Sequence, residues 1–148
     1  MKHPLTKEEF DSIYSRVPRL CVEAIVQTSH GIVLSRRTDP PAVGQWHIPG
    51  GTVIKGERLR DTVIRIVREE LCLQEHQIST PEMVGVIEYD FSSEQYDGFP
   101  VGIAFVVHSE EEPRIGRSAS DVKCFSVLPK DMIPEQRYFL EKHDLLSV

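Results

Sequence analysis

The chain has 148 residues, enough for one domain with a sizeable core, and its 40% apolar and 27% charged residues are ordinary for a soluble globular protein. The net charge of −6 argues against a nucleic acid polymer as partner, and no apolar run approaches the roughly 20 residues that a membrane-spanning helix needs. Three widely spaced cysteines, and an N-terminus without the apolar stretch of a secretion signal, predict reduced thiols and a cytoplasmic location.

The first half of the chain is predicted to begin with a short helix, because Thr6-Lys7-Glu8-Glu9 fits a capping box. This helix reaches about residue 15 and belongs to an N-terminal extension over residues 1–18. Periodicity and turn residues predict the elements that follow: strands at 20–27, 31–36 and 46–49, a glycine-glycine turn at 50–51, and a long helix at 58–71.

The second half is predicted to hold three strands and a C-terminal helix. Their expected positions are 83–91, 100–108 and 123–128 for the strands, and Pro134 for the start of the helix. Strands and helices alternate without repeats or linkers. The expected fold is therefore α/β, a single domain over residues 1–148 with a mixed sheet between helices, an α/β/α sandwich.

The long helix carries two acids at unusual positions. Glu70 lies inside its apolar arc, and Glu69 lies on the edge of that arc, one turn after Arg65. A buried carboxylate is costly unless it is paired or binds a cation, although Glu70 could reach water at the helix end and Glu69 could form a surface pair with Arg65. The preceding glycine pair and Glu57 favour the cation, because acidic oxygens and a backbone carbonyl are ligands that Mg²⁺ prefers.

Residues 51–73 resemble the sequence box of the Nudix hydrolases, G-x5-E-x7-R-E-U-x-E-E-x-G-U, in which U is a bulky aliphatic residue. The matching positions are Gly51, Glu57, Arg65, Val67, Glu69, Glu70 and Leu73. Ile66 replaces the first glutamate of the REUxEE run, and Cys72 replaces the glycine. Four further segments, RTDPPAVGQWHIPGG, LTKEEFDSIYSRVP, SEEEPRIGRSASDVKCF and YFLEKH, are similar to GDP-mannose mannosyl hydrolases, a Nudix subgroup that also has an aliphatic residue where Ile66 stands.

The resemblance implies a divalent metal, Mg²⁺ with Mn²⁺ as the alternative ion. Gly50 would offer its backbone carbonyl to the ion, Glu70 its carboxylate, and Glu69 a second carboxylate. Glu57 and Arg65 would pair or order the loop before the helix, with Arg65 near phosphate. These four side chains, Glu57, Arg65, Glu69 and Glu70, are the expected catalytic residues.

The resemblance also implies a nucleotide or sugar-nucleotide substrate, and a homodimer. Arg37 matches an arginine that contacts substrate, with Arg36 beside it as the alternative. Glu23 stands where the subgroup has an aspartate of the catalytic site, although a strand residue facing water is the competing interpretation. Trp46 could stack on a base or sugar, or belong to the core.

Two departures bear on the reaction. The subgroup has Gln-His before its last strand, the Gln for metal and the His as general base, where this chain has Ala119-Ser120. The subgroup's arginine after the two glycines is replaced by Thr52. The acids that remain as candidate bases are Asp121, Glu69, Glu88, Asp90, Glu94 and Asp97.

The expected activity is therefore Mg²⁺-dependent hydrolysis, at phosphorus, of a nucleoside diphosphate linked to another moiety. Two alternatives stay open. One is a sugar-nucleotide glycosyl hydrolase that attacks the sugar carbon, and the other is a nucleotide-binding module with little turnover.

Overall fold

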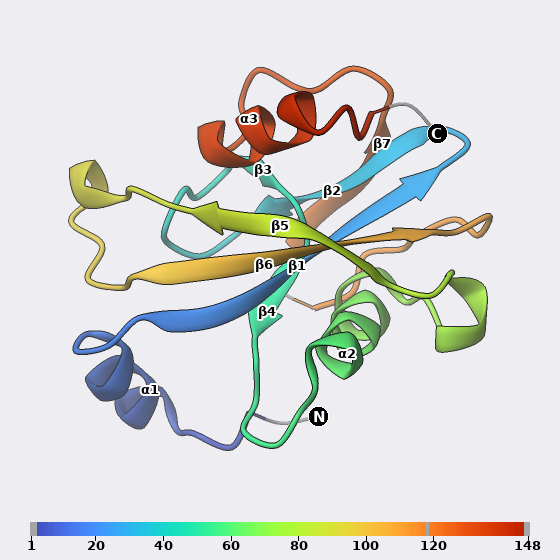
Figure 1. Cartoon of the computed structure of the whole chain (residues 1–148). Helices are drawn as coiled ribbons and strands as arrows, with labels where there is room; N and C mark the ends of the chain where they lie inside the picture. Colours follow the sequence, from blue (N-terminus) through green and yellow to red (C-terminus); the bar gives the residue numbers. More distant parts are fainter. Residues whose placement is uncertain (1–2, 118, 147–148) are drawn as a thin grey trace.

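The computed structural model describes residues 3–117 and 119–146, and shows one mixed sheet between helices (Figure 1). In chain order the elements are α1 (Lys7–Tyr14), β1 (Arg19–Thr28), β2 (Gly31–Arg37), β3 (Trp46–His47), β4 (Gly50–Thr52), α2 (Leu59–Leu71), β5 (Glu82–Glu88), β6 (Pro100–His108), β7 (Ala119–Phe125) and α3 (Pro134–Lys142). Single turns of 3₁₀-helix lie at Glu75–Gln77 and Ser92–Glu94. None of the helices in these residues is long and apolar enough to cross a membrane.

The central strand of the sheet is β1, which pairs with three neighbours. The seven strands include the path β3-β2-β1-β6-β5, with β4 added to β1 and β7 added to β2. The β1–β6 pair is parallel and the other pairs are antiparallel. Residues 21–28 of β1 are all buried, as expected for a strand covered on both faces.

Alternate residues of β1 point to two apolar cores on opposite faces of the sheet. Val22, Ala24 and Val26 pack toward α2, whereas Ile25 packs with the residues of α3. The helix α2 contributes Val63, Ile66, Val67 and Leu71 to the first core, and these are the buried members of its predicted apolar arc. The predicted α/β fold with a mixed sheet between helices is confirmed.

The structure corrects two predicted elements. The last strand runs over Ala119–Phe125 instead of 123–128, because the polar residues at its start pair with β2, with Ala119 opposite Arg37. The glycine pair is not a turn. Gly50 and Gly51 lie in β4, where they pair antiparallel with Glu23 and Val22.

Candidate active site

The two glycines of β4 face different parts of the molecule. A Cβ added to Gly50 would lie 2.3 Å from Oε2 of Glu23, and one added to Gly51 would lie 3.4 Å from Cγ1 of Ile66. A side chain at position 50 would therefore clash with Glu23, whereas one at position 51 would make ordinary contact with Ile66. The strand β4 thus faces α2 at Gly51 and the opposite face of the sheet at Gly50. Ile66 is 1% exposed and serves as core packing beneath Gly51, so no third helix acid stands at that position.

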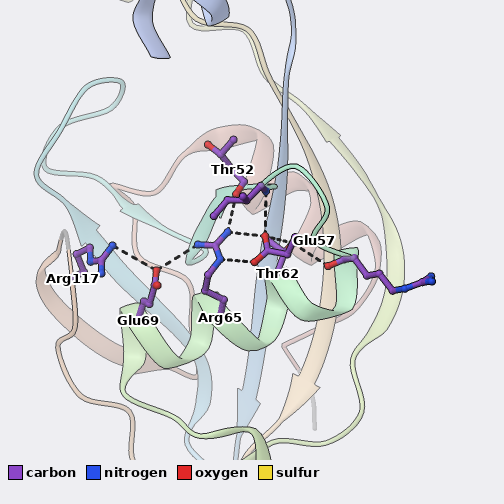
Figure 2. Close-up of polar contacts among 8 residues, drawn as sticks. Thr52, Glu57, Thr62, Arg65, Glu69 and Arg117 are labelled. Carbon is purple, nitrogen blue, oxygen red and sulfur yellow. Dashed lines mark hydrogen bonds and ion pairs between the residues drawn. The ribbon is translucent and has the colours of Figure 1, made fainter. Parts of the chain in front are cut away.

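Glu57 and Arg65 form the ion pair that the box predicts (Figure 2). Nε and Nη2 of Arg65 donate to the two carboxylate oxygens of Glu57 at 2.7 and 3.0 Å, and Nη2 also donates to the Thr52 carbonyl at 2.8 Å. Thr62 Oγ1 donates to Glu57 at 2.8 Å. Burial alone would raise the pKa of Glu57, but these hydrogen bonds outweigh it and lower the pKa to about 2. Glu57 is thus a permanent anion that fixes Arg65, and Arg65 in turn holds β4 against the helix.

Glu69 extends this network toward the C-terminal part of α2. Its carboxylate lies 3.4 Å from Nη1 of Arg65 and 3.7 Å from Nη1 of Arg117 (Figure 2). The segment that carries Arg117 is fixed by backbone bonds, because the amides of Gly116 and Arg117 donate to the carbonyls of Glu70 and Glu69 at 3.0 and 2.8 Å. These bonds satisfy carbonyls that the end of a helix would leave without partners.

Glu70 is half-buried at the end of the same helix. Burial raises the pKa of its carboxyl to about 7, against the opposing effect of Arg117 and with a further rise from Glu69. A buried carboxyl whose charged form is disfavoured gains from a bound cation. The donor chemistry at α2 therefore suits a divalent ion.

Within residues 3–117 and 119–146, no group of three or more His, Cys, Asp and Glu side chains is placed to hold a metal. Mg²⁺ does not require such a group, because it is commonly held by one or two carboxylates together with water and substrate phosphate oxygens. Glu69, Glu70 and the carbonyl of Gly50 match this donor set.

A cavity of about 150 Å³ lies on the other side of β4, facing α3. Its lining includes Arg19, Glu23, Arg37, Gly50, Gly51 and Tyr89. The cavity is smaller than the roughly 300–1,000 Å³ that holds a whole drug-sized ligand, so it suits one part of a larger substrate. The strand β4 thus borders this cavity and also contacts α2, through Gly51 on Ile66 and through the Thr52 carbonyl on Arg65.

Glu23 lies in the cavity wall and does not face water, which corrects the competing interpretation from the sequence. It is 7% exposed, and it accepts a 3.0 Å hydrogen bond from the hydroxyl of Tyr89. That hydroxyl in turn accepts one from Nε2 of Gln136 at 2.8 Å, and the Gln136 carbonyl oxygen accepts the amide of Ile48 at 2.7 Å. Burial raises the pKa of Glu23 to about 7, although the Tyr89 hydrogen bond opposes the rise.

Arg37 and its neighbour Arg36 have different surroundings in the structure. Arg37 lines the cavity, and its guanidinium donates to the carbonyls of Pro41 and Asp39 at 2.5 and 3.1 Å. Arg36 instead pairs with Asp131 at 2.8 Å. Of these two neighbours, Arg37 is therefore the one available to a ligand in this cavity.

Trp46 lies in the core and not in the cavity wall. It is 4% exposed, its ring meets Phe125 edge to face, and Arg36 and Lys123 lie over it. Stacking of Trp46 on a base or sugar, one of its two predicted roles, would require a free ring face. We therefore leave Trp46 out of the site.

The acids of the 88–97 loop lie at the surface. Glu88, Asp90, Glu94 and Asp97 are exposed, and none of them belongs to the described lining of the cavity. Asp121 is half-buried in β7, where it accepts its neighbour's amide and lies 3.6 Å from Lys123. Of the six candidate bases, Glu69 is the one that belongs to the box network.

Sequence reasoning missed three residues of the site: Arg19, Tyr89 and Gln136. Each stands near the end of an element, where a polar side chain is ordinarily solvated, and only tertiary packing brings the three together. A charged residue directly before the apolar run of residues 20–26 was the one available signal for Arg19.

A family model described as the NUDIX domain matches residues 17–142. The chain is 31% identical over 91 residues to the low-salt glycan biosynthesis protein Agl8 of Haloferax volcanii, covering 62% of this chain and 56% of that protein. It is 29% identical over 118 residues to an ADP-ribose pyrophosphatase of Methanocaldococcus jannaschii, covering 76% and 66%. The chain thus matches less than two thirds of the length of either relative.

Solved structures share the fold. The NUDIX domain of Shewanella oneidensis NrtR, crystallised with ADP ribose, has a TM-score of 0.70 and 24% identity, covering 95% of this chain and 98% of that one. The MutT protein of Methanosarcina mazei has a TM-score of 0.72 and 20% identity, covering 86% and 94%. With the box residues in their network and the family model matching most of its length, the chain belongs to the NUDIX-domain family.

Proposed function

We propose that the protein is a divalent-metal-dependent hydrolase that cleaves a nucleoside diphosphate linked to another moiety, with water attacking phosphorus. The observation that carries this proposal is the position of β4. Thr52 of this strand is bound by the Arg65–Glu57–Glu69 network, while Gly50 borders the cavity that contains Arg37. An extended diphosphate substrate fits between an acidic metal site and a basic cavity.

Glu70, Glu69 and the carbonyl of Gly50 would hold the ion, Mg²⁺ or Mn²⁺. Such an ion, when bound, neutralises charge on the diphosphate and lowers the pKa of water. Arg37 would bind phosphate oxygens, which its planar guanidinium suits. Glu69 is our assignment for the group that takes the proton from the attacking water, because it belongs to the Arg65–Glu57 network, whereas the loop acids are exposed.

An ADP-ribose-like substrate is the form of this proposal that the relatives favour. One of them is named an ADP-ribose pyrophosphatase, and the NUDIX domain of NrtR was crystallised with ADP ribose. ADP-ribose is itself a nucleoside diphosphate linked to a sugar. The homodimer implied by the resemblance stays a prediction, to be measured by light scattering.

A nucleotide-binding module with little turnover is the second candidate, and Ile66 favours it. The buried side chain of Ile66 removes one acid from the box, and Ala119 and Ser120 provide neither a metal ligand nor a base.

A turnover screen separates these functions. The purified protein with Mg²⁺ or Mn²⁺ would be incubated with ADP-ribose, nucleoside diphosphate sugars, dinucleotides and nucleoside triphosphates, and the products separated by chromatography. Release of a nucleoside monophosphate supports the hydrolase. Release of free sugar and a nucleoside diphosphate would overturn attack at phosphorus. Ligand-induced thermal stabilisation without turnover would favour the binding module.

A further inference from the structure

Arg19 places a second guanidinium in the cavity that contains Arg37. It stands at the start of β1, and Cys21, two residues later, pairs with Thr52 of β4. Nη1 of Arg19 donates to Thr52 Oγ1 at 3.0 Å and to Cys21 Sγ at 3.1 Å, and Nη2 donates to the Tyr96 hydroxyl at 3.3 Å. The guanidinium carbon therefore lies beside the side chain of position 52.

The partners of both cavity arginines are neutral. Arg19 contacts a thiol and two hydroxyls and lies over the Phe10 ring at 5.4 Å, and Arg37 contacts two carbonyls. Across residues 3–117 and 119–146, neither of them forms an ion pair, whereas Arg65 pairs with Glu57 and Glu69. Nε of Arg19 is buried and lacks a hydrogen-bond partner.

Holding two guanidinium groups in a cavity without an anion costs folding free energy, because buried charge is tolerated only when it is paired. The cavity has one carboxyl of its own, Glu23. Two guanidinium groups and one carboxyl leave net positive charge in this small cavity even when Glu23 is ionised.

We propose that Arg19 binds phosphate oxygens of the substrate diphosphate, together with Arg37, and that it occupies the place an arginine at position 52 would fill. The anion is the diphosphate of the proposed substrate, so its identity rests on the proposed function. A guanidinium is suited to this role because its donors match phosphate oxygens in pairs.

The first test is anion binding by the whole protein. Isothermal titration calorimetry with inorganic pyrophosphate and with ADP, at fixed Mg²⁺, would compare the wild type with Arg19→Gln. A hydrogen-bonded charge contact predicts a loss of affinity of about 10- to 100-fold. Arg16→Gln is the matched control, since it removes the same charge from an exposed position three residues earlier and should bind as the wild type does.

The second test is rescue by relocation. The double variant Arg19→Gln/Thr52→Arg restores a guanidinium beside the same cavity from the neighbouring strand, and should recover most of the lost affinity. A structural role of Arg19, in holding Tyr96 and Phe10, would lower the melting temperature and would not be repaired from position 52. Recovery therefore supports the proposal, and failure of a folded double variant to recover affinity overturns it.

Wild-type affinity of Arg19→Gln for both anions would also overturn the proposal, as would a wild type that binds neither. These outcomes are distinct from failure of the proposed function. A protein that binds ADP through Arg19 but turns over no substrate refutes the hydrolase and leaves the role of Arg19 standing.

Discussion

Glu70 is the residue on which the proposed chemistry depends most directly. Glu70→Gln keeps the size of the side chain and removes the carboxylate that would hold the metal. We expect kcat to fall by at least about 100-fold. A bound metal lowers the activation free energy by several kcal/mol through charge stabilisation, and each 1.4 kcal/mol lost slows the reaction tenfold. Glu110→Gln, at an exposed turn, is the control. Full metal-dependent activity of Glu70→Gln would refute the assignment.

Glu23 predicts a pH dependence of stability. Its carboxyl has a pKa of about 7 in the folded protein against 4.5 for the free group, so the folded state holds the proton more tightly. The stabilisation of the folded state that comes from this bound proton is fully present below pH 4.5 and is lost as the pH rises through 7. The slope of the free energy of unfolding in that window is at most about 1.4 kcal/mol per pH unit.

Glu23→Gln keeps an acceptor for the Tyr89 hydroxyl and removes the titration. Urea unfolding between pH 4.5 and 8 should show a flatter profile for this variant than for the wild type. Parallel profiles would mean that Glu23 titrates in the folded protein as it does in water.

The place of some site residues can be predicted from the sequence, and that of others cannot. Glu57, Arg65 and Glu69 are predictable because local spacing along one loop and helix brings them together. Glu57 pairs with Arg65 as the box predicts, and Glu69 also pairs with Arg65, which the sequence offered as the alternative to a cation site. Arg19 and Tyr89 are not, because they meet in one cavity only through the pairing of distant strands.

Among the elements, α2 ends in a way that explains the glycine of the box. Cys72 stands at that position with φ 58°, in the left-handed region, and its amide closes the last turn on Arg68 at 3.2 Å. The next amide, of Leu73, bonds to the Val67 carbonyl at 3.1 Å. This is the geometry in which helices commonly end on glycine, and a side chain there carries a penalty.

Cys72→Gly should therefore stabilise the protein. Relief of the left-handed strain, partly offset by the greater backbone entropy of glycine in the unfolded state, predicts a gain of up to about 1 kcal/mol, or about 2–4 °C in melting temperature. Cys72→Ala is the control, because it removes the thiol and keeps the Cβ. A gain in the alanine variant equal to that in the glycine variant would show that the thiol and not the backbone is responsible.

Elements with strong periodicity were predictable, and those made by tertiary pairing were not. The helix α2 and the strands β1 and β6 have long apolar patterns that specify their type. The strand β4 is different: its glycines have no strand preference, and they are extended because β1 pairs with them and because Glu23 and Ile66 pack against them. The polar start of β7 likewise becomes a strand through its pairing with β2.

At the scale of the whole molecule, the acids of α2 lie on one face of the sheet and the arginine-lined cavity faces α3 on the other. Figure 1 shows α2 and α3 on opposite faces, and β4 lies beside the central strand between them. Arg65 of the α2 network and Arg19 of the cavity come from different layers, and both donate to Thr52 of this short strand. The alternation of strands and helices predicts these layers, but which residues meet at β4 depends on strand order, which periodicity does not reveal.

Metal binding should stabilise the molecule as a whole. An ion that binds the folded state alone raises the free energy of unfolding by about 2.7 kcal/mol at a hundred times its dissociation constant. Thermal unfolding with increasing MgCl₂ or MnCl₂ should show a rising melting temperature for the wild type and a much smaller rise for Glu70→Gln. Equal rises in the two proteins would place the ion elsewhere.

Attack of water at phosphorus is the central claim, and isotope incorporation tests it most directly. Hydrolysis of ADP-ribose, or of the best substrate in the screen, would be run in ¹⁸O-labelled water and the products weighed by mass spectrometry. We predict the label in a phosphate group of the products, with a nucleoside monophosphate released. Label in the hydroxyl of a free sugar, with an unlabelled nucleoside diphosphate, would contradict the account.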